Sequence, residues 1–225
     1  MKNKYLATGI ALALFCGVTA ATKPDPAEPL QRAGAEKHHA AFLARAQQGN
    51  IGLLLLGDSI TAGWGRADQF KKYQPANFGV SGDRTEHVLW RITNGELDGI
   101  HPKVVLLLIG TNNTGKDSAD DIARADKKII EIIQTKLPQT KVLLMGIFPR
   151  GPVDDLRRAL IRAVNKQLAR LDDGQKVRYL DIGEKLLNEK GDLTPEISHD
   201  KLHLTAKGYE IWAAAVTPLL DELMK

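Results

Sequence analysis

The sequence feature that most constrains the fold is a run of four leucines, residues 53–56, followed by the segment 57–61 (GDSIT). A short, continuous apolar run that ends at a glycine is typical of a strand buried on both faces, as strands of parallel sheets are. Ser59 comes just past the carboxyl end of that strand, where open α/β sheets present ligand-binding and reactive side chains. Ser59 is therefore a candidate nucleophile, and it needs a base, a group that orients the base, and oxyanion donors.

Apolar runs and amphipathic segments alternate along the rest of the chain. Strands are predicted at 51–56, 76–78, 104–109, 141–146 and 177–180, and helices at 33–48, 85–92, 118–136, 156–171 and 205–220. This alternation predicts a parallel sheet with helices on both faces. A length of 225 residues with 43% hydrophobic content suits one domain around one sizeable core.

The first 21 residues have the pattern of a secretory signal peptide. A basic start is followed by an apolar stretch at 10–18 and small residues up to Ala21, which predicts cleavage near Ala20 or Ala21 and an exported protein. The alternative is an uncleaved membrane anchor, but the apolar stretch is shorter than the roughly 20 residues that a spanning helix needs. We therefore expect no stable membrane span after cleavage. The only cysteine, Cys16, lies in this leader, so the mature protein is expected to contain no disulfide.

The region after the leader divides into a linker and a domain. Residues 22–32 contain prolines at 24, 26 and 29 and are expected to form an extended linker, and residues 33–225 the folded domain. The formal net charge of +4 includes Lys2 and Lys4 of the leader, and basic residues elsewhere are interleaved with acidic ones. This balance argues against a nucleic-acid partner.

Unusual residues occupy four predicted strand-to-helix junctions, at 57–59, 79–82, 110–113 and 198–203. Glycine allows close approach of the backbone to a ligand, and asparagine offers a side-chain amide donor. The Ser59 N–H, the Gly82 N–H and the Asn112 side chain are therefore candidate oxyanion donors. Taken singly, each glycine also fits an ordinary turn, and Asn112 also fits a turn residue that bonds its own backbone.

His203 is the best candidate for the base. Asp200, three residues earlier, is close enough to accept from Nδ1–H, which would leave Nε2 facing the serine. One alternative is that Asp200 caps a turn and His203 is an ordinary hydrogen-bonded histidine. Another is a metal site built on His199 and His203, but the segment does not read as helical and no third ligand has a clear spacing.

The candidate site residues lie in segments that resemble those of a known family. The segments 57–61, Gly82, 110–113 and 200–203 resemble, in order, the four blocks of the SGNH (GDSL) hydrolases, and 77–85, 87–91, 94–97 and 203–205 are similar to the catalytic subunits of intracellular platelet-activating-factor acetylhydrolases and their bacterial relatives. The resemblance extends from about residue 36 to the C-terminus.

The resemblance implies a role for each candidate residue. Ser59 is expected to be the nucleophile, His203 the general base and acid, and Asp200 its orienter, with Gly82 and Asn112 joining the Ser59 amide as the oxyanion hole. It also implies a flavodoxin-like three-layer α/β/α sandwich with a five-stranded parallel sheet. It implies that no metal and no cofactor is needed, and it is compatible with a homodimer. We interpret Asp58 as a structural residue of the turn, and four histidine and tryptophan side chains as surface or packing residues: His38, His39, His87 and Trp90.

The expected function is that of an exported serine ester hydrolase. It would remove short acyl groups, acetyl above all, from carbohydrate esters; 5% aromatic content and no long apolar insertion agree with a short acyl group. A lysophospholipase or lipase is the alternative among enzymes. A non-catalytic carbohydrate-binding module is the alternative of another class, and its signature would be loss of Ser59, Asp200 or His203, all of which are present.

Overall fold

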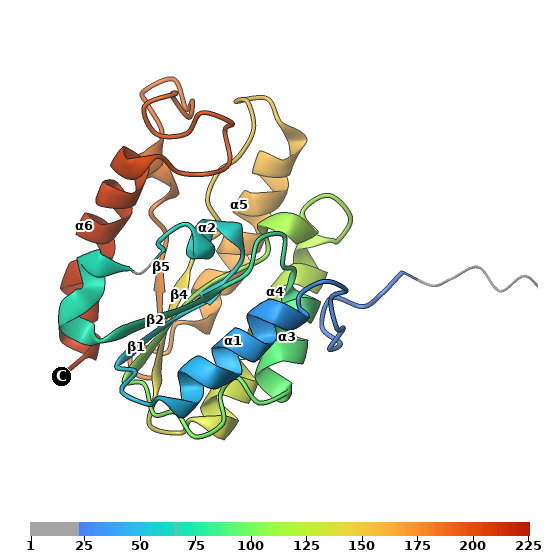
Figure 1. Cartoon of the computed structure of the whole chain (residues 1–225). Helices are drawn as coiled ribbons and strands as arrows, with labels where there is room; N and C mark the ends of the chain where they lie inside the picture. The colour runs from blue at the N-terminus through green and yellow to red at the C-terminus, as the bar shows by residue number, and fades with distance from the viewer. Residues whose placement is uncertain (1–22, 66) are drawn as a thin grey trace, which may run out of the picture.

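A five-stranded parallel sheet forms the centre of the computed structural model, which describes residues 23–65 and 67–225 (Figure 1). Its strands are β1 (Leu53–Gly57), β2 (Pro75–Gly79), β3 (Val104–Leu108), β4 (Lys141–Met145) and β5 (Val177–Leu180). All neighbouring pairs are parallel, and the spatial order is β2-β1-β3-β4-β5. This is the flavodoxin-like order, so the predicted fold class is confirmed.

Helices connect the strands in the places that the sequence periodicity predicts. They are α1 (Glu36–Gln47), α2 (Ser59–Ala62), α3 (Thr85–Thr93), α4 (Ala119–Lys136), α5 (Leu156–Leu168) and α6 (Ala206–Leu223), with 3₁₀ turns η1 (Asp68–Tyr73), η2 (Thr111–Asn113), η3 (Ala169–Leu171) and η4 (Gly183–Leu186). Each predicted strand and helix lies within about three residues of an observed one. The single turn α2 and most of the 3₁₀ turns were not predicted, because elements this short carry no hydrophobic period.

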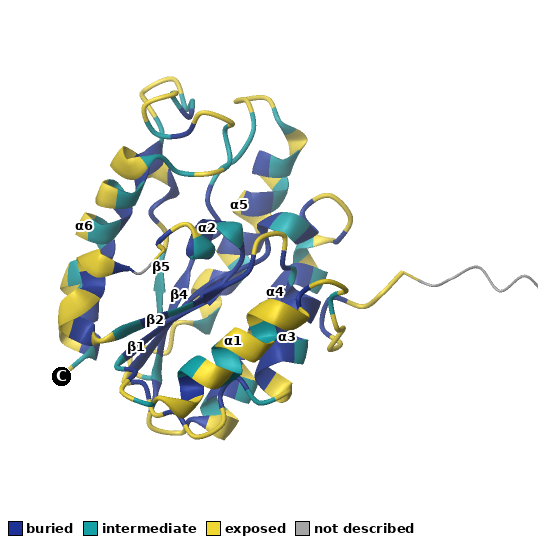
Figure 2. Cartoon of the chain, viewed as in Figure 1, coloured by how far each residue is buried: buried dark blue, intermediate teal, exposed yellow. Residues whose placement is uncertain are grey.

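The sheet has a separate hydrophobic core on each face, which explains why β1 reads as an unbroken apolar run. Leu54 and Leu56 point to the face covered by α1, α3, α4 and α5. Leu53 and Leu55 point to the opposite face, which is covered by α6 and η1. Successive strand residues alternate between faces, and with helices on both sides every residue of β1 is buried (Figure 2).

Polar caps set where the long helices begin. The Ser118 hydroxyl accepts from the Asp121 N–H at 3.1 Å at the start of α4, and the Thr205 hydroxyl accepts from the Gly208 N–H at 3.3 Å at the start of α6. Because each cap ends a strand-to-helix loop, it holds that loop at the carboxyl edge of the sheet.

The N-terminal segment, residues 23–34, contains no helix or strand, but it is held against the fold. The Leu30 N–H donates to the Glu86 carbonyl at 3.0 Å, at the start of α3. Asp25 pairs with Arg124 at 2.9 Å, and Glu28 with Lys128 at 2.8 Å, both on α4. The part of the expected linker that is described is thus a docked segment. The expected signal peptide, residues 1–21, lies outside the described residues, and no helix within 23–65 or 67–225 is both long and apolar enough to cross a membrane.

Candidate active site

Ser59 is presented by a tight turn from β1 into α2. A Cβ added to Gly57 would collide with the Leu108 carbonyl oxygen, so only glycine fits at the end of β1. Asp58 caps α2, since its Oδ1 accepts from the Ile60 N–H at 2.9 Å. Asp58 therefore holds the turn, as we interpreted it from the sequence, and Ser59 follows as a half-buried residue at the first position of the helix.

Neighbouring strands and helices fix α2 in place. The Asn77 side chain, on β2, donates to the Thr61 carbonyl at 2.9 Å, and the Tyr209 hydroxyl, on α6, donates to the Ile60 carbonyl at 2.7 Å. A Cβ added to Gly79 would collide with the Ala62 nitrogen, so the end of β2 packs directly on α2. A rigid support of this kind keeps a nucleophile in one position.

The structure brings Ser59, His203 and Asp200 together, although Ser59 and His203 are 144 residues apart in the sequence. Ser59 Oγ lies 3.0 Å from His203 Nε2. On the other side of the ring, His203 Nδ1 lies 2.6 Å from Asp200 Oδ2. Since ionised Asp200 can only accept, Nδ1 carries the proton and Nε2 is the acceptor for the Ser59 hydroxyl.

The loop before α6 is folded around the Asp200 carboxylate. Its Oδ1 accepts from the backbone N–H groups of Leu202 at 3.0 Å and His203 at 2.8 Å. Lys201 adopts a left-handed conformation with φ of 58°, which lets the loop turn back on itself. The hydrogen bond from the His203 side chain holds the pKa of Asp200 well below its ordinary value, so this carboxylate stays ionised across the neutral range.

The three candidate oxyanion donors follow three strands that are adjacent in the sheet. Ser59 follows β1, Gly82 follows β2, and Asn112 lies in η2 after β3. Neighbouring strands lie about 4.8 Å apart, which brings these strand ends close to one another. Gly82 has a φ of 78°, and within the described part of the chain no acceptor is found for its N–H.

Asn112 and Asn113 have different surroundings, although they are adjacent in sequence. The half-buried Asn112 uses one N–H of its side-chain amide to bind the Asp83 carbonyl at 2.8 Å, which leaves the second N–H for another acceptor. Asn113 is fully buried: its Oδ1 accepts from the Thr85 N–H at 3.1 Å and its Nδ2 donates to Asp117 at 2.8 Å. Asn113 therefore joins two loops, whereas Asn112 keeps a donor that can serve a substrate.

Two buried carboxyl groups, Asp58 and Asp126, have raised pKa values. Burial raises the pKa of Asp58 to about 7, and its Oδ2 has no hydrogen-bond partner among the described residues. Asp126, on α4, is also buried, and neither of its carboxyl oxygens has a partner within the same residues. Burial raises the pKa of Asp126 well above its ordinary value, and the nearby Asp58 raises it further.

Sequence reasoning missed Arg150, which lies between the loops that carry Asn112 and His203. Its guanidinium donates to the Thr111 carbonyl at 3.1 Å, and the following Gly151 N–H donates to the Lys201 carbonyl at 2.8 Å. Burial lowers the pKa of Arg150, although Asp58 and Asp200 counteract this effect. In the sequence, the available signal was the segment 149–151, which resembles the same SGNH (GDSL) hydrolases.

Two of the histidines interpreted as surface or packing residues make specific contacts. His39, on α1, pairs through Nδ1 with Glu96 at 2.9 Å and packs against the Trp90 ring at a centroid distance of 4.8 Å. His87 is buried, and its Nδ1 accepts from the Arg84 N–H at 3.0 Å at the start of α3. His199 is exposed, and the residues that the structure describes contain no group of three or more His, Cys, Asp or Glu side chains arranged to hold a metal ion.

Comparison with known proteins places the site in a family. Residues 55–211 match the family model described as GDSL-like Lipase/Acylhydrolase family. The chain is 32% identical over 211 residues to platelet-activating factor acetylhydrolase IB subunit alpha1 of Bos taurus, an alignment that covers 91% of this chain and 90% of the relative.

Solved structures show the same fold at lower identity. A GDSL-like lipase from Bacteroides thetaiotaomicron aligns with a TM-score of 0.67 and 20% identity, over 84% of this chain and 98% of that one. An acetyl-xylooligosaccharide esterase from Geobacillus aligns with a TM-score of 0.60 and 18% identity, over 77% of this chain and 96% of that one. The chain belongs to the GDSL-like lipase/acylhydrolase family and is a carboxylic ester hydrolase.

Proposed function

We propose that this protein is an exported serine esterase that removes short acyl groups, mainly acetyl, from carbohydrate esters, with Ser59, His203 and Asp200 as its catalytic triad. The observation that carries the proposal is the pair of contacts at His203: Nε2 is 3.0 Å from Ser59 Oγ and Nδ1 is 2.6 Å from Asp200 Oδ2. A serine, a histidine and a carboxylate in this order form a nucleophile, a base and an orienting group.

In the first half of the reaction, the Ser59 hydroxyl gives its proton to His203 Nε2 while Oγ attacks the ester carbonyl carbon. The imidazolium that forms is stabilised by ionised Asp200. The tetrahedral intermediate collapses when the C–O bond to the alcohol breaks and His203 returns the proton to the leaving oxygen. In the second half, His203 takes a proton from a water molecule as the water oxygen attacks the acyl carbon. The bond between that carbon and Ser59 Oγ then breaks, His203 returns the proton to Oγ, and the carboxylic acid leaves.

The carbonyl oxygen becomes negative in both tetrahedral intermediates. The Ser59 N–H, the Gly82 N–H and the second amide N–H of Asn112 are the donors that we assign to it. Fixed donors of this kind act on the charge that develops in the transition state, so they raise kcat more than they lower KM.

The exposure of the triad supports an ester substrate in which a small acyl group is joined to a large alcohol. The His203 side chain is 48% exposed and that of Asp200 is 54% exposed. A surface-exposed triad leaves room for a sugar that belongs to a longer chain. The curated relative is named an acetylhydrolase, which supports acetyl as the acyl group. Export is supported by the signal-peptide pattern of residues 1–21 alone.

A lipase-type activity is the second candidate, and one surface feature favours it. Val153 is 52% exposed and Leu156 is 88% exposed, and both lie just after Arg150, between β4 and the start of α5. Exposed apolar side chains beside an active site can contact a fatty chain or a lipid surface. This candidate predicts that longer acyl esters are preferred.

The test is hydrolysis of p-nitrophenyl acetate, butyrate and octanoate by the chain that begins at Thr22, with Ser59→Ala alongside. Ser118→Ala is the matched control, because it removes the same hydroxyl from a serine that caps α4. We expect Ser59→Ala to lose about 10⁶-fold in kcat, by analogy with serine hydrolases that lose their nucleophile. We expect Ser118→Ala to keep wild-type kcat.

Each outcome selects one interpretation of the site. Preference for acetate, lost in Ser59→Ala, supports the proposal, and acetate release from acetylated xylo-oligosaccharides would then test the carbohydrate alcohol. Preference for octanoate, also lost in Ser59→Ala, selects the lipase-type enzyme. Full activity in Ser59→Ala overturns the triad, and inactivity of the wild type on all three esters would favour a carbohydrate-binding module.

A further inference from the structure

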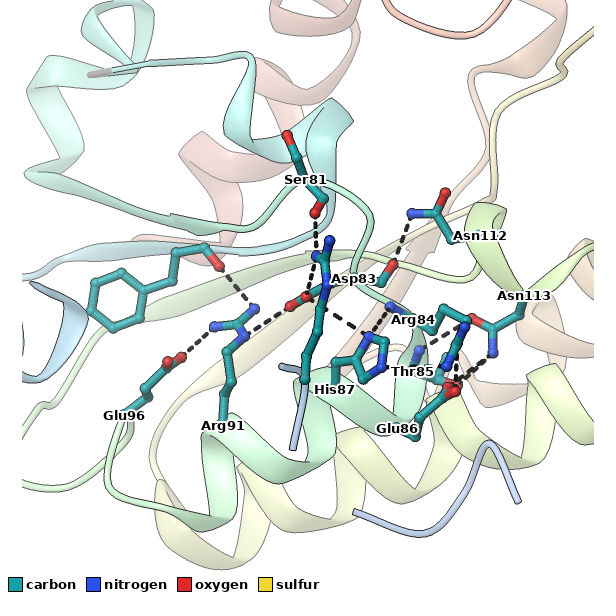
Figure 3. A network of polar contacts seen from close by, with 12 residues as sticks. Ser81, Asp83, Arg84, Thr85, Glu86, His87, Arg91, Glu96, Asn112 and Asn113 are labelled. Carbon is teal, nitrogen blue, oxygen red and sulfur yellow. Dashed lines mark hydrogen bonds and ion pairs between the residues drawn. The ribbon is translucent and has the colours of Figure 1, made fainter. Parts of the chain in front are cut away.

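Two of the three proposed oxyanion donors are attached to one buried residue, Asp83. Asp83 directly follows Gly82 in the chain, so its backbone position sets the orientation of that glycine. Its carbonyl oxygen accepts from Asn112 Nδ2 at 2.8 Å (Figure 3). Whatever holds Asp83 therefore holds the donor that follows β2 and the donor that follows β3.

The Asp83 carboxylate is fully buried and is held from two sides by arginines. Arg91, on α3, donates through Nε to Oδ2 at 2.9 Å, and Arg32 donates through Nη1 to Oδ1 at 3.1 Å. His87 Nδ1 lies farther away, 3.9 Å from Oδ1. A buried carboxylate is tolerated only with such partners, and the partners in turn fix its position.

Arg91 connects Asp83 to the interior of the protein. It also donates to the Phe78 carbonyl at 3.0 Å, at the end of β2, and it forms a buried ion pair with Glu96 (Figure 3). Glu96 is bound in turn by His39 on α1. The side chains of Arg91 and Glu96 are almost completely buried, so this side of Asp83 is a rigid support.

Arg32 connects Asp83 to the N-terminal segment. Its guanidinium also donates to the Ser81 carbonyl, so it holds the residue before Gly82 as well as the residue after it. A Cβ added to Gly82 would lie 2.8 Å from Arg32 Nη2, which shows how closely the guanidinium covers the glycine. Arg32 lies outside the residues that match the family model, and its side chain is 34% exposed.

We propose that Asp83 and Arg32 are positioning residues of the oxyanion hole, and that the N-terminal segment is therefore part of the catalytic apparatus. The inference rests on the proposed function, and it assigns no contact with substrate to either residue. Gly82 lies in a left-handed turn that the backbone alone leaves flexible. The two arginines remove this freedom, and preorganised donors stabilise the transition state without reorganising.

A purely structural role for Arg32 makes a different prediction. The N-terminal segment has other ion pairs with the fold, and the one between Glu28 and Lys128 does not involve residues 80–84, the loop between β2 and α3. If Arg32 only anchors the segment, loss of Lys128 should have the same consequence as loss of Arg32. Lys128→Met and Arg32→Met are a matched pair, because each removes one partly exposed cation and the ion pair that it forms between this segment and the fold.

The experiment measures kcat, KM and the thermal midpoint with p-nitrophenyl acetate for wild type and five variants: Arg32→Met, Arg32→Lys, Lys128→Met, Asp83→Asn and Ser59→Ala. We expect Arg32→Met to lower kcat about 10-fold or more, below the 10²–10³-fold loss of a complete oxyanion donor. KM should change less than about twofold, because the ground state makes little use of these donors. Arg32→Lys should recover part of kcat, since one ammonium can reach one of the two acceptors.

Asp83→Asn should lower kcat at least as much as Arg32→Met, and Lys128→Met should leave kcat at the wild-type value. Should Asp83→Asn fail to fold, the kcat of Arg32→Met still tests the inference, because the Arg32 side chain is partly exposed and its loss should leave the protein folded. Wild-type kcat in Arg32→Met overturns the inference, as does an equal loss in Lys128→Met. If Ser59→Ala is inactive while Arg32→Met keeps its kcat, only this inference fails; if Ser59→Ala is fully active, the proposed function fails with it.

Discussion

Asp200 holds His203 at two points with one carboxylate. Oδ2 lies 2.6 Å from the ring Nδ1, and Oδ1 accepts from the His203 backbone N–H at 2.8 Å. The ring and the main chain of the histidine are therefore fixed by the same group. This double contact lowers the pKa of Asp200, and it commits Nε2 to face Ser59.

Asp200→Asn should leave the loop folded and remove most of the activity. The asparagine Oδ1 can still accept from the backbone, but the charge that stabilises the imidazolium is lost and the ring can adopt the wrong tautomer. In other triads this change costs about 10⁴-fold in kcat. Asp192→Asn is the control, since Asp192 pairs with Lys201 at 2.7 Å in the same region without touching His203. Equal kcat values for the two variants would contradict the role of Asp200.

The adjacent asparagines should separate catalysis from stability. Asn112→Ala removes a donor with a free N–H and should lower kcat by about 10²–10³-fold with little change in KM. Asn113→Ala removes the partner of the buried Thr85 N–H and Asp117 Oδ2, and unsatisfied buried groups cost about 1–3 kcal/mol each. The loss in Asn113→Ala should therefore fall mainly on the free energy of unfolding. Urea denaturation and steady-state kinetics on both variants measure the two effects, and a reversed pattern would exclude Asn112 as a donor.

The hydrophobic pattern of the sequence was enough to predict the sheet, because strands such as β1 are buried on both faces and need apolar residues at every position. Ser59, Asp200 and His203 could be predicted as neighbours because each follows a strand or precedes a helix at one edge. The buried charge network could not be found in this way. Its ion pairs connect α1, α3 and the N-terminal segment, and no local period records such long-range contacts.

Helix α3 was predicted from the sequence, but the burial of its charged residues was not. Glu86, His87 and Arg91 are all buried in a helix that reads as amphipathic. Arg91 is tolerated in the interior because it pairs with Asp83, and Glu86 because it accepts from Asn113, whereas His87 bonds to Arg84 at the start of its own helix. Likewise, three prolines indicated an extended segment before residue 33, but its docking depends on ion pairs with α4 that only the fold creates.

Asp58→Asn should change how stability depends on pH. The pKa of Asp58 rises from an ordinary value of 3.8 to about 7 on folding, because the carboxyl is buried. The free energy of unfolding contributed by this group is therefore greatest below about pH 4 and falls as the pH rises to about 7, above which it is constant. A shift of about three pKa units corresponds to a loss on the order of 4 kcal/mol. An asparagine in place of Asp58 keeps the cap of α2 and does not titrate, so the gain of the variant over wild type should grow between pH 4 and 7 in urea denaturation.

Asp126→Asn should also raise the free energy of unfolding relative to wild type as the pH rises, but over a different pH range. Both oxygens of Asp126 lack partners among the described residues, and burial raises its pKa well above 3.8. The folded protein therefore keeps a proton that the unfolded chain releases near pH 4, and stability falls with rising pH until the pKa of the folded state is reached. The variant should match wild type at pH 4 and exceed it by more as the pH rises, until the pKa of the folded state is reached. Parallel curves for the two proteins would show that Asp126 is not protonated by burial. Because the charge of Asp58 contributes to the shift of Asp126, the double variant should gain less than the sum of the single variants only at pH values where both carboxyl groups are ionised in the folded protein.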